Sequence, residues 1–211
     1  MEKIEEMTAE RSLNIIRQSI EQSRRAVMKN AGTPMLIWGI LVFCTALIVS
    51  YLWMHAGGPK WNYLWFVMTI IGFVITYLMG KKHKHQPVGF VGKVIGYIWI
   101  TFAIFGTTLP LMLSLGIFGN YLQTVSIGLG FSGLFITSYE VLLMGFSATV
   151  SGFILNNKLI VLCGIVSGIG GIFWANLTEH GNQMFVIAGV AVLCLIVPGL
   201  IMNSKSKRES L

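Results

Sequence analysis

The sequence predicts an all-α protein, a polytopic transmembrane helical bundle. Only 11% of its 211 residues are charged and 55% are apolar, whereas roughly a quarter of the residues in soluble domains are charged. The apolar residues gather in runs of about 20, which is the length that a helix needs to cross a bilayer. Basic residues cluster between these runs. The composition therefore excludes a soluble enzyme and a nucleic-acid-binding domain, and we expect no nucleic-acid partner.

The first segment, residues 1–33, is expected to form an amphipathic cytoplasmic helix and a linker. Glu21 precedes Arg24 and Arg25 by one turn, so that its side chain can pair with either of them. Gly32 and Pro34 then break the helix, because proline suits the first turn of a new helix and lacks the donor that an interior position needs. The apolar residues that recur on one face of this helix are Leu13, Ile16, Ile20 and Val27.

Residues 34–203 are expected to form the bundle, and residues 204–211 a basic cytoplasmic tail. Four apolar runs are clear, whereas the nearly uncharged stretch 121–175 holds either two spans or three. We predict six spans in all. They are expected at about 35–54, 61–79, 94–115, 139–155, 159–175 and 184–202.

The placement of basic residues favours six spans over seven. With six spans, 14 of the 15 Lys and Arg residues lie on the cytosolic side and only Lys60 lies outside, as the positive-inside rule requires. A seventh span at about 120–137 would move Lys158 and the tail outside. With six spans both termini are cytoplasmic. The apolar segment 116–137 then lies at the outer side, as an interfacial or re-entrant segment or as part of a long tilted helix.

Candidate pathway or interaction residues are few, because charged groups are almost absent from the predicted spans. Glu140 is expected at the outer start of the fourth span, where the positive end of the helix dipole favours a carboxylate. Thr107, Thr108 and Pro110 form the second candidate. Proline frees a backbone carbonyl that the threonine hydroxyls can satisfy, which gives a kink that shapes the bundle or lines a pathway.

Small residues four positions apart predict close packing of the fourth span on the fifth, with a homodimer interface as the alternative. In lipid such faces gain van der Waals contact because little hydrophobic force acts between spans. The residues expected at this contact are Ser147, Ala148, Ser151, Gly152, Gly164, Ser167, Gly168 and Gly171.

The basic loop KKHKH is interpreted as a contact for anionic lipid headgroups through Lys81, Lys82 and Lys84. No Cys, Asp or Glu lies near its two histidines, so no metal site is predicted. No cofactor is expected either. A membrane enzyme would have to draw its acid and base groups from Glu140, Glu179 or His180, and the sequence carries no catalytic motif. We therefore expect no enzymatic activity.

Three sequence segments resemble a group of uncharacterised small bacterial inner-membrane proteins. They are SLNIIRQSI at 12–20, TPMLIWGILV at 33–42, and a helix ending in GFIL and NNK before a glycine-rich span. The resemblance covers the chain from the amphipathic helix to the last span. It implies a location in the bacterial cytoplasmic membrane, with no known activity and no functional residues.

These observations predict a non-enzymatic membrane protein that acts through protein or lipid interaction. Residues 1–30 would form its cytoplasmic handle, for a protein partner or for a homodimer. The alternative is a small transporter or channel for a neutral or lipophilic solute. It would be built around residues 107–110 and the segment 116–137.

Overall fold

The structure, a computed structural model, describes residues 9–82, 89–114, 135–178 and 182–208. Every regular element in these ranges is a helix, which confirms the predicted all-α fold. The elements are α1 (Ala9–Asn30), α2 (Gly32–His55), the 3₁₀ helix η1 (Gly58–Tyr63), α3 (Leu64–Lys82), α4 (Phe90–Ser114), α6 (Phe135–Leu155), α7 (Lys158–Leu177), α8 (Gln183–Ala191), the π-helical segment η2 (Val192–Ile196) and α9 (Val197–Arg208).

Six stretches in these ranges are long and apolar enough to cross a membrane, as the sequence predicted. The last of them combines α8, η2 and α9, and the third begins at Phe90 rather than near residue 94. The six are Gly32–His55, Lys60–Lys81, Phe90–Met112, Ile136–Leu155, Lys158–Leu177 and Gln183–Ser204.

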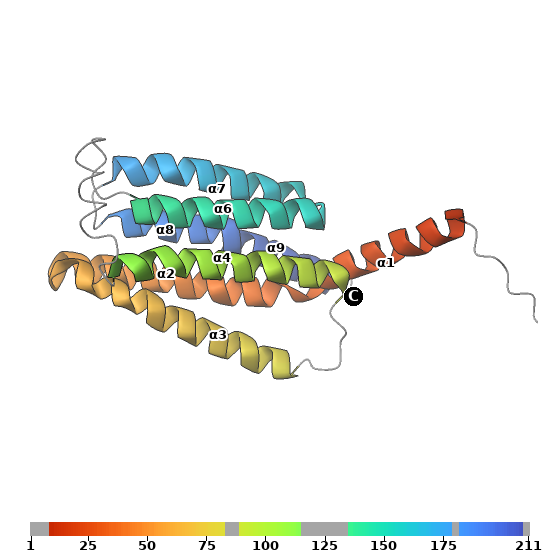
Figure 1. Cartoon of the computed structure of the whole chain (residues 1–211), viewed down its shortest axis with the longest axis horizontal. Helices are drawn as coiled ribbons and strands as arrows, with labels where there is room; N and C mark the ends of the chain where they lie inside the picture. Colours follow the sequence, from red (N-terminus) through yellow and green to blue (C-terminus); the bar gives the residue numbers. More distant parts are fainter. Residues whose placement is uncertain (1–8, 83–88, 115–134, 179–181, 209–211) are drawn as a thin grey trace, which may run out of the picture.

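Successive spans run in opposite directions along the bundle (Figure 1). We call the end that carries α1 and the last turn of α9 the α1 end, and the end that carries η1 the opposite end. Because the number of spans is even, α1 and α9 meet at the same end, where they contact each other. The predicted break after α1 is confirmed. The linker expected there consists of one residue, Ala31.

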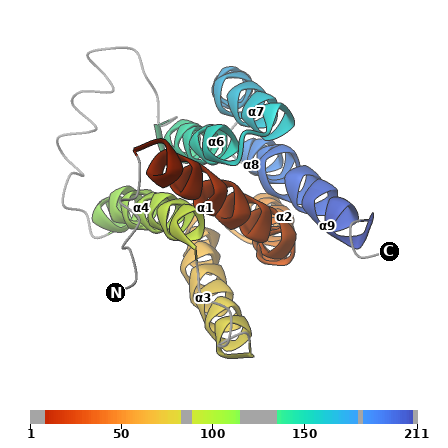
Figure 2. The same ribbon diagram turned by 90° about the vertical axis from the view of Figure 1, so that its right-hand side faces the viewer.

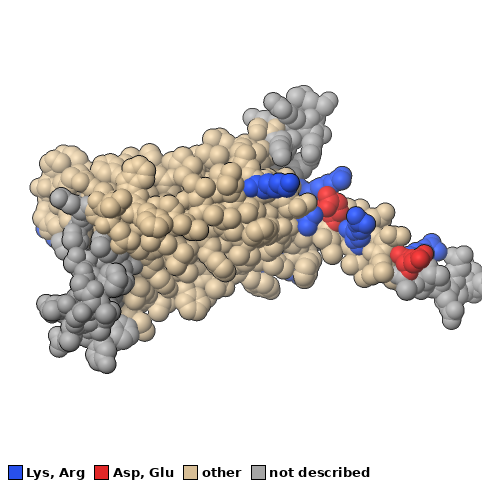
Figure 3. Space-filling view, turned by 90° about the horizontal axis from the view of Figure 1, so that it is seen from above, with Lys and Arg blue, Asp and Glu red and all other residues tan. Residues whose placement is uncertain are grey.

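Basic residues gather at the α1 end. Of the Lys and Arg residues in the described ranges, Lys60 alone lies in an element at the opposite end. In the space-filling view most of the blue and red atoms lie over α1 and the adjoining end of the bundle, and a long surface with almost no charged atoms extends away from them (Figure 3). This separation of charge is the pattern that the positive-inside rule describes for a membrane protein.

Two adjacent asparagines make the tight turn between α6 and α7. Asn156 adopts a φ of 52°, in the left-handed region that asparagine tolerates. The N–H groups of Asn156 and Asn157 donate to the carbonyls of Phe153 and Gly152, at 3.0 and 2.9 Å, which is a Schellman motif. The Asn157 carboxamide oxygen then accepts from the N–H of Leu159 at 3.1 Å and caps α7. The NNK sequence thus ends one span and starts the next.

Glycines bring α2 against the last span. A Cβ atom added to Gly39 of α2 would lie 2.7 Å from the Ile196 side chain, and one added to Gly199 of α9 would lie 2.8 Å from the side chain of Leu36. Farther along α2, Ala46 and Val49 are fully buried in the core. Close approach of backbones is how helices gain packing energy in lipid, so α2 and the last span form the centre of the bundle.

The last span changes its winding just before a proline. Pro198 has no N–H to donate to the carbonyl of Cys194, and the π-helical turn η2 lies directly before it. The Cys194 thiol is fully buried and lies 2.7 Å from the Ser167 hydroxyl of α7. The irregular turn is therefore paired with a polar side chain from the neighbouring span, as is typical of prolines in membrane helices.

α3 lies at the edge of the bundle and leans away from it (Figures 1 and 2). Its main polar contact is with α2, where the Trp38 indole N–H donates to the Thr76 hydroxyl at 2.9 Å. The Trp38 ring covers Gly72, and any Cβ at Gly72 would overlap it.

The predicted outer segment 116–137 lies mostly outside the described residues. Its last residues belong to α6, which begins at Phe135 rather than near residue 139. Ser114 ends α4 and Phe135 begins α6 at the same end of the bundle, the opposite end (Figure 1). α4 and α6 therefore run antiparallel, as the six-span arrangement requires.

Candidate functional site

The threonines before Pro110 bond to their own helix. The Thr107 hydroxyl donates to the carbonyl of Ala103 at 2.7 Å, and the Thr108 hydroxyl donates to that of Ile104 at 2.6 Å. Pro110 frees the carbonyl of Gly106, four residues earlier. The expectation that the threonines satisfy the freed carbonyl is therefore wrong. Side chains of a helix lean toward its N-terminus, so these hydroxyls reach back to residues 103 and 104 instead.

α6 contacts this part of α4 through two adjacent residues. The Tyr139 hydroxyl donates to the carbonyl of Phe105 at 3.1 Å. Glu140 lies against Gly106, where an added Cβ would lie 3.0 Å from Oε2. The structure thus brings together the two candidates that the sequence placed in separate spans, Glu140 and the segment 107–110.

Glu140 lies deeper than the sequence predicted. Because α6 begins at Phe135, the carboxyl group lies beyond the first turn, where the helix dipole acts most strongly. Its Oε1 atom is buried and has no hydrogen-bond partner among the described residues. The expected position of Glu140 at the start of the helix is therefore wrong. Glu140 is a carboxyl group held between two membrane helices.

The predicted close packing of α6 on α7 is confirmed for the glycines. A Cβ on Gly145 would overlap the Cα atom of Gly168, and one on Gly164 would overlap Thr149. A Cβ on Gly152 would lie 2.6 Å from the backbone nitrogen of Val161. Backbone therefore meets backbone where Gly145 faces Gly168, which leaves no room for a side chain at that point.

Ser147 and Ser151 do not belong to that contact. Two residues correspond to about 200° of helix rotation, so Ser147 lies on the far side of α6 from Gly145. Both serines are buried, and the Ser151 hydroxyl has no hydrogen-bond partner among the described residues. At helical spacing Glu140, Ser147 and Ser151 share one side of α6. We call it the Glu140 face.

Gly171 lies where three spans meet. A Cβ added to it would overlap Val141 of α6 and would lie 3.0 Å from a methyl group of Val190 in α8. Its predicted role in packing is confirmed, but it joins α7 to two neighbours rather than to one.

Gln183 is a buried polar residue that the sequence reasoning missed. Its side-chain oxygen accepts from the Thr137 hydroxyl at 3.0 Å, and its amide donates to the carbonyl of Ala175 at 3.3 Å. It therefore ties together α6, α7 and α8 at the opposite end of the bundle. Its position at the polar start of an apolar run gave no sign of burial, because the same position suits a solvated helix start.

α1 is attached to the bundle through two consecutive residues, which form hydrogen bonds with backbone groups at the ends of two other helices. The Ser23 hydroxyl accepts from the N–H of Val91, in the first turn of α4, at 3.1 Å. The Arg24 Nε donates to the carbonyl of Ile154, in the last turn of α6, at 2.9 Å. Helix ends leave such groups without partners inside their own helix. The predicted Glu21–Arg24 pair is confirmed at 3.3 Å.

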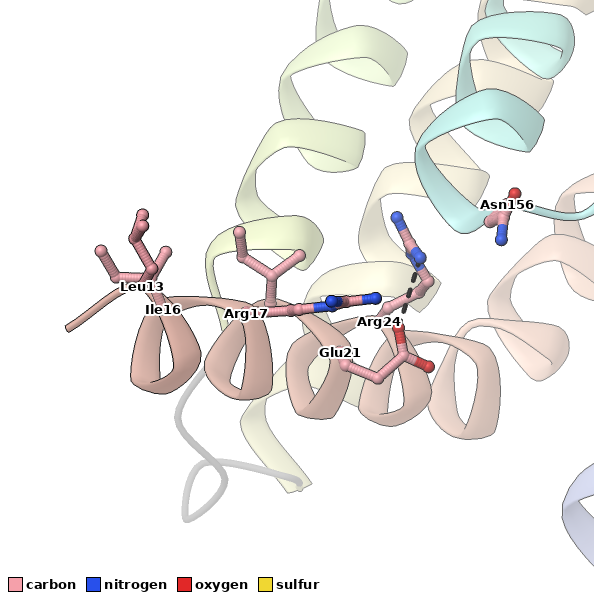
Figure 4. Close-up of a pocket in the computed structure, with 7 residues that line it drawn as sticks. Leu13, Ile16, Arg17, Glu21, Arg24 and Asn156 are labelled. Atoms are coloured by element: carbon pink, nitrogen blue, oxygen red, sulfur yellow. Dashed lines mark hydrogen bonds and ion pairs between the residues drawn. The ribbon is translucent and has the colours of Figure 1, made fainter. Parts of the chain in front are cut away.

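A cavity of about 580 Å³ lies between α1 and the end of α6. We call it the α1 cavity. In Figure 4, Leu13, Ile16 and Arg24 extend from the same side of α1, and Arg24 reaches toward the end of α6, beside which Asn156 lies. The cavity is lined by Leu13, Ile16, Arg17, Ile20, Glu21, Arg24 and Asn156. Its wall is thus part aliphatic and part basic.

The predicted lipid contacts in the basic loop are only partly described. Lys81 is exposed in the last turn of α3, at the α1 end. Lys82 ends that helix. Lys84 lies outside the described residues.

No metal-binding cluster is found in the parts of the chain that the structure describes. These parts hold no group of three or more His, Cys, Asp or Glu side chains. The three cysteines are free thiols, with Cys44 exposed, Cys163 half-buried and Cys194 buried.

Comparison of the sequence with models of known families, with curated proteins and with solved structures gives no significant match. The resemblance to bacterial inner-membrane proteins therefore stays an expectation.

Proposed function

We propose that the chain is a non-enzymatic integral membrane protein that acts by interaction at the cytosolic membrane surface, and that α1 is the interacting element. The observation that carries this proposal is the different environment of the two halves of α1. Its C-terminal half is fixed to the bundle by Ser23 and Arg24. Its N-terminal half keeps Leu13, Ile16 and Ile20 exposed, at 65, 55 and 40%. We call these three residues the α1 stripe.

An anchored helix with an exposed apolar stripe is suited to bind a protein or lipid partner. A stripe left in water would be unfavourable by roughly 25 cal/mol for each Å² of apolar surface. Anchoring also presents the stripe in a fixed orientation, so that a ligand does not have to order the helix when it binds. On this proposal the α1 end faces the cytosol of a bacterium, in line with the gathering of basic residues there.

Photo-crosslinking tests the proposal. A photoreactive amino acid is placed at Ile16, on the stripe, or at Ile15, which is also exposed but lies on another side of α1. The full-length chain is irradiated in native membranes. We expect adducts from position 16 at several times the yield from position 15. Equal yields, or no adduct from position 16, would contradict a binding role for the stripe.

A second candidate function, a small transporter, is favoured by the Glu140 face. Glu140 and Ser151 carry buried polar atoms without partners among the described residues, and Ser147 lies between them. Polar groups inside the membrane mark solute or proton pathways. In liposomes, Glu140→Gln is expected to abolish any flux of a neutral solute or of protons that the natural chain supports. Glu10→Gln, on α1, is the control. Absence of flux from the natural chain would remove this candidate.

A further inference from the structure

The α1 cavity combines two chemical properties that rarely occur together on a protein surface. One part of its wall is the α1 stripe, which is aliphatic. The other part carries the guanidinium groups of Arg17 and Arg24, with Glu21 beside them. A ligand that fits both parts has an anionic group joined to a hydrocarbon portion.

Charge in the cavity is not balanced. Arg24 already donates to Ile154 and to Glu21, and the same Glu21 carboxylate also pairs with Arg25 at 3.4 Å. Arg17 makes no hydrogen bond or ion pair with any residue that the structure describes. The cavity is lined by two arginines, Arg17 and Arg24, and by one carboxylate, Glu21, which it shares with Arg25 outside the cavity, and so it has an excess of positive charge.

The position of the cavity restricts the source of its ligand. Its far wall is Asn156, the turn residue at the α1 end of two membrane-length helices. Headgroups of a bilayer that the six spans cross lie at the level of such turns. Arginine binds phosphate oxygens through paired N–H groups, and acyl chains or a glycerol backbone would cover the aliphatic wall.

We propose that the α1 cavity binds the headgroup of an anionic phospholipid, with its phosphodiester on Arg17 and Arg24 and its apolar portion against the α1 stripe. This assignment rests on the proposed interaction function of α1 and names its ligand. It differs from the contacts expected for the loop lysines, because its ligand would contact aliphatic and basic side chains of α1 together with Asn156, rather than a charged loop.

Native mass spectrometry of the delipidated full-length chain tests the assignment. The chain is titrated with phosphatidylglycerol or with phosphatidylcholine of the same acyl length. We expect tighter binding of the first phosphatidylglycerol molecule, and we expect Arg17→Gln to weaken it about tenfold, the loss of one charge-assisted contact. Arg25→Gln is the matched control, because it removes the same charge from the same helix but from outside the cavity. We expect it to change binding less than about twofold.

Two further measurements separate the possible ligands. Ile16→Ser is expected to weaken phosphatidylglycerol binding while it leaves any binding of inorganic phosphate unchanged. Competition by inorganic phosphate at concentrations comparable to those of the lipid would overturn the lipid assignment in favour of a free anion. Equal effects of Arg17→Gln and Arg25→Gln, or equal affinity for both lipids, would also overturn it.

Failure of this assignment is distinguishable from failure of the proposed function. Adducts from position 16 that consist of protein, together with no preference for phosphatidylglycerol, would leave α1 as an interacting element and remove the lipid site. The absence of adducts from position 16 would remove the interaction function itself.

Discussion

Arg24 of α1 donates its Nε–H to the carbonyl of Ile154 at 2.9 Å, across 130 residues of sequence. Ile154 lies in the last turn of α6, where carbonyl groups have no partner in their own helix and the helix dipole is negative. One residue earlier, the Ser23 hydroxyl accepts from Val91 at the start of α4. A single turn of α1 therefore provides hydrogen-bond partners for two helix ends. It bonds to a carbonyl group at the C-terminal end of α6 and to an N–H group at the N-terminal end of α4.

Arg24→Gln is expected to loosen α1 from the bundle. The substitution leaves the Ile154 carbonyl without its charged donor, which would lower the free energy of docking by about 1 kcal/mol. Hydrogen exchange of the backbone amides of α1 in detergent should rise severalfold. Arg25→Gln is the control, since Arg25 is 78% exposed and bonds only to Glu21 among the described residues. Equal exchange in the two variants would contradict the anchoring role.

Gly145→Ala is expected to destabilise the contact of α6 with α7. The new methyl group would overlap the Cα atom of Gly168, and backbone cannot move aside as a flexible side chain can. We expect a loss of about 1–3 kcal/mol in the free energy of unfolding, measured by titration with SDS. Gly170→Ala in α7 is the control, because nothing lies within 4 Å of a Cβ there. If Gly145→Ala were as stable as the control, the backbones of α6 and α7 would have to lie farther apart than the structure places them.

Gln183→Leu is expected to weaken the junction of three spans. It removes the hydrogen bond with Thr137 and the one to the Ala175 carbonyl. Interhelical hydrogen bonds in membranes contribute about 0.6 kcal/mol on average and at most about 1.7 kcal/mol. A double-mutant cycle with Thr137→Val isolates the first of these bonds. Strictly additive losses of stability would mean that the two side chains do not interact.

Cysteine labelling from one side of the membrane tests the arrangement of the spans. In a chain whose native cysteines are replaced, Asn157→Cys and Ser204→Cys should react with an impermeant maleimide from the same side. Lys60→Cys should react only from the other side, because it lies at the opposite end of the bundle. Intact cells and inverted vesicles provide the two sides. Reaction of positions 60 and 157 from one side would exclude the six-span arrangement.

Patterns along the chain were enough to predict several local features. The six spans follow from apolar runs of membrane length. The end of α1 follows from Gly32 and Pro34, and the close contact of α6 and α7 follows from small residues at a spacing of four. Each feature depends on residues near one another in sequence, whose geometry a helix fixes.

Relationships between distant segments were not predictable. The sequence predicted Glu21, one turn away, as a partner of Arg24, but it did not predict Ile154. The sequence grouped Ser147 and Ser151 with the glycines because all of these small residues recur at a spacing of four. The rotation of the helix nevertheless turns both serines to the Glu140 face. The sequence located Glu140 at a helix start because the polar residues 137–140 interrupt an apolar stretch, whereas α6 begins before them at Phe135.

Hydropathy and backbone hydrogen bonding act locally, and the order of residues along the chain is therefore enough to predict its membrane-length helices, their number and where most of them end. The packing of the helices had to be known to find that Glu140 lies against Gly106, that Gln183 joins three spans, and that an open cavity with basic and aliphatic walls lies between α1 and the turn after α6. Those contacts depend on how helices rotate and cross, and many sequences of the same hydropathy would rotate and cross differently.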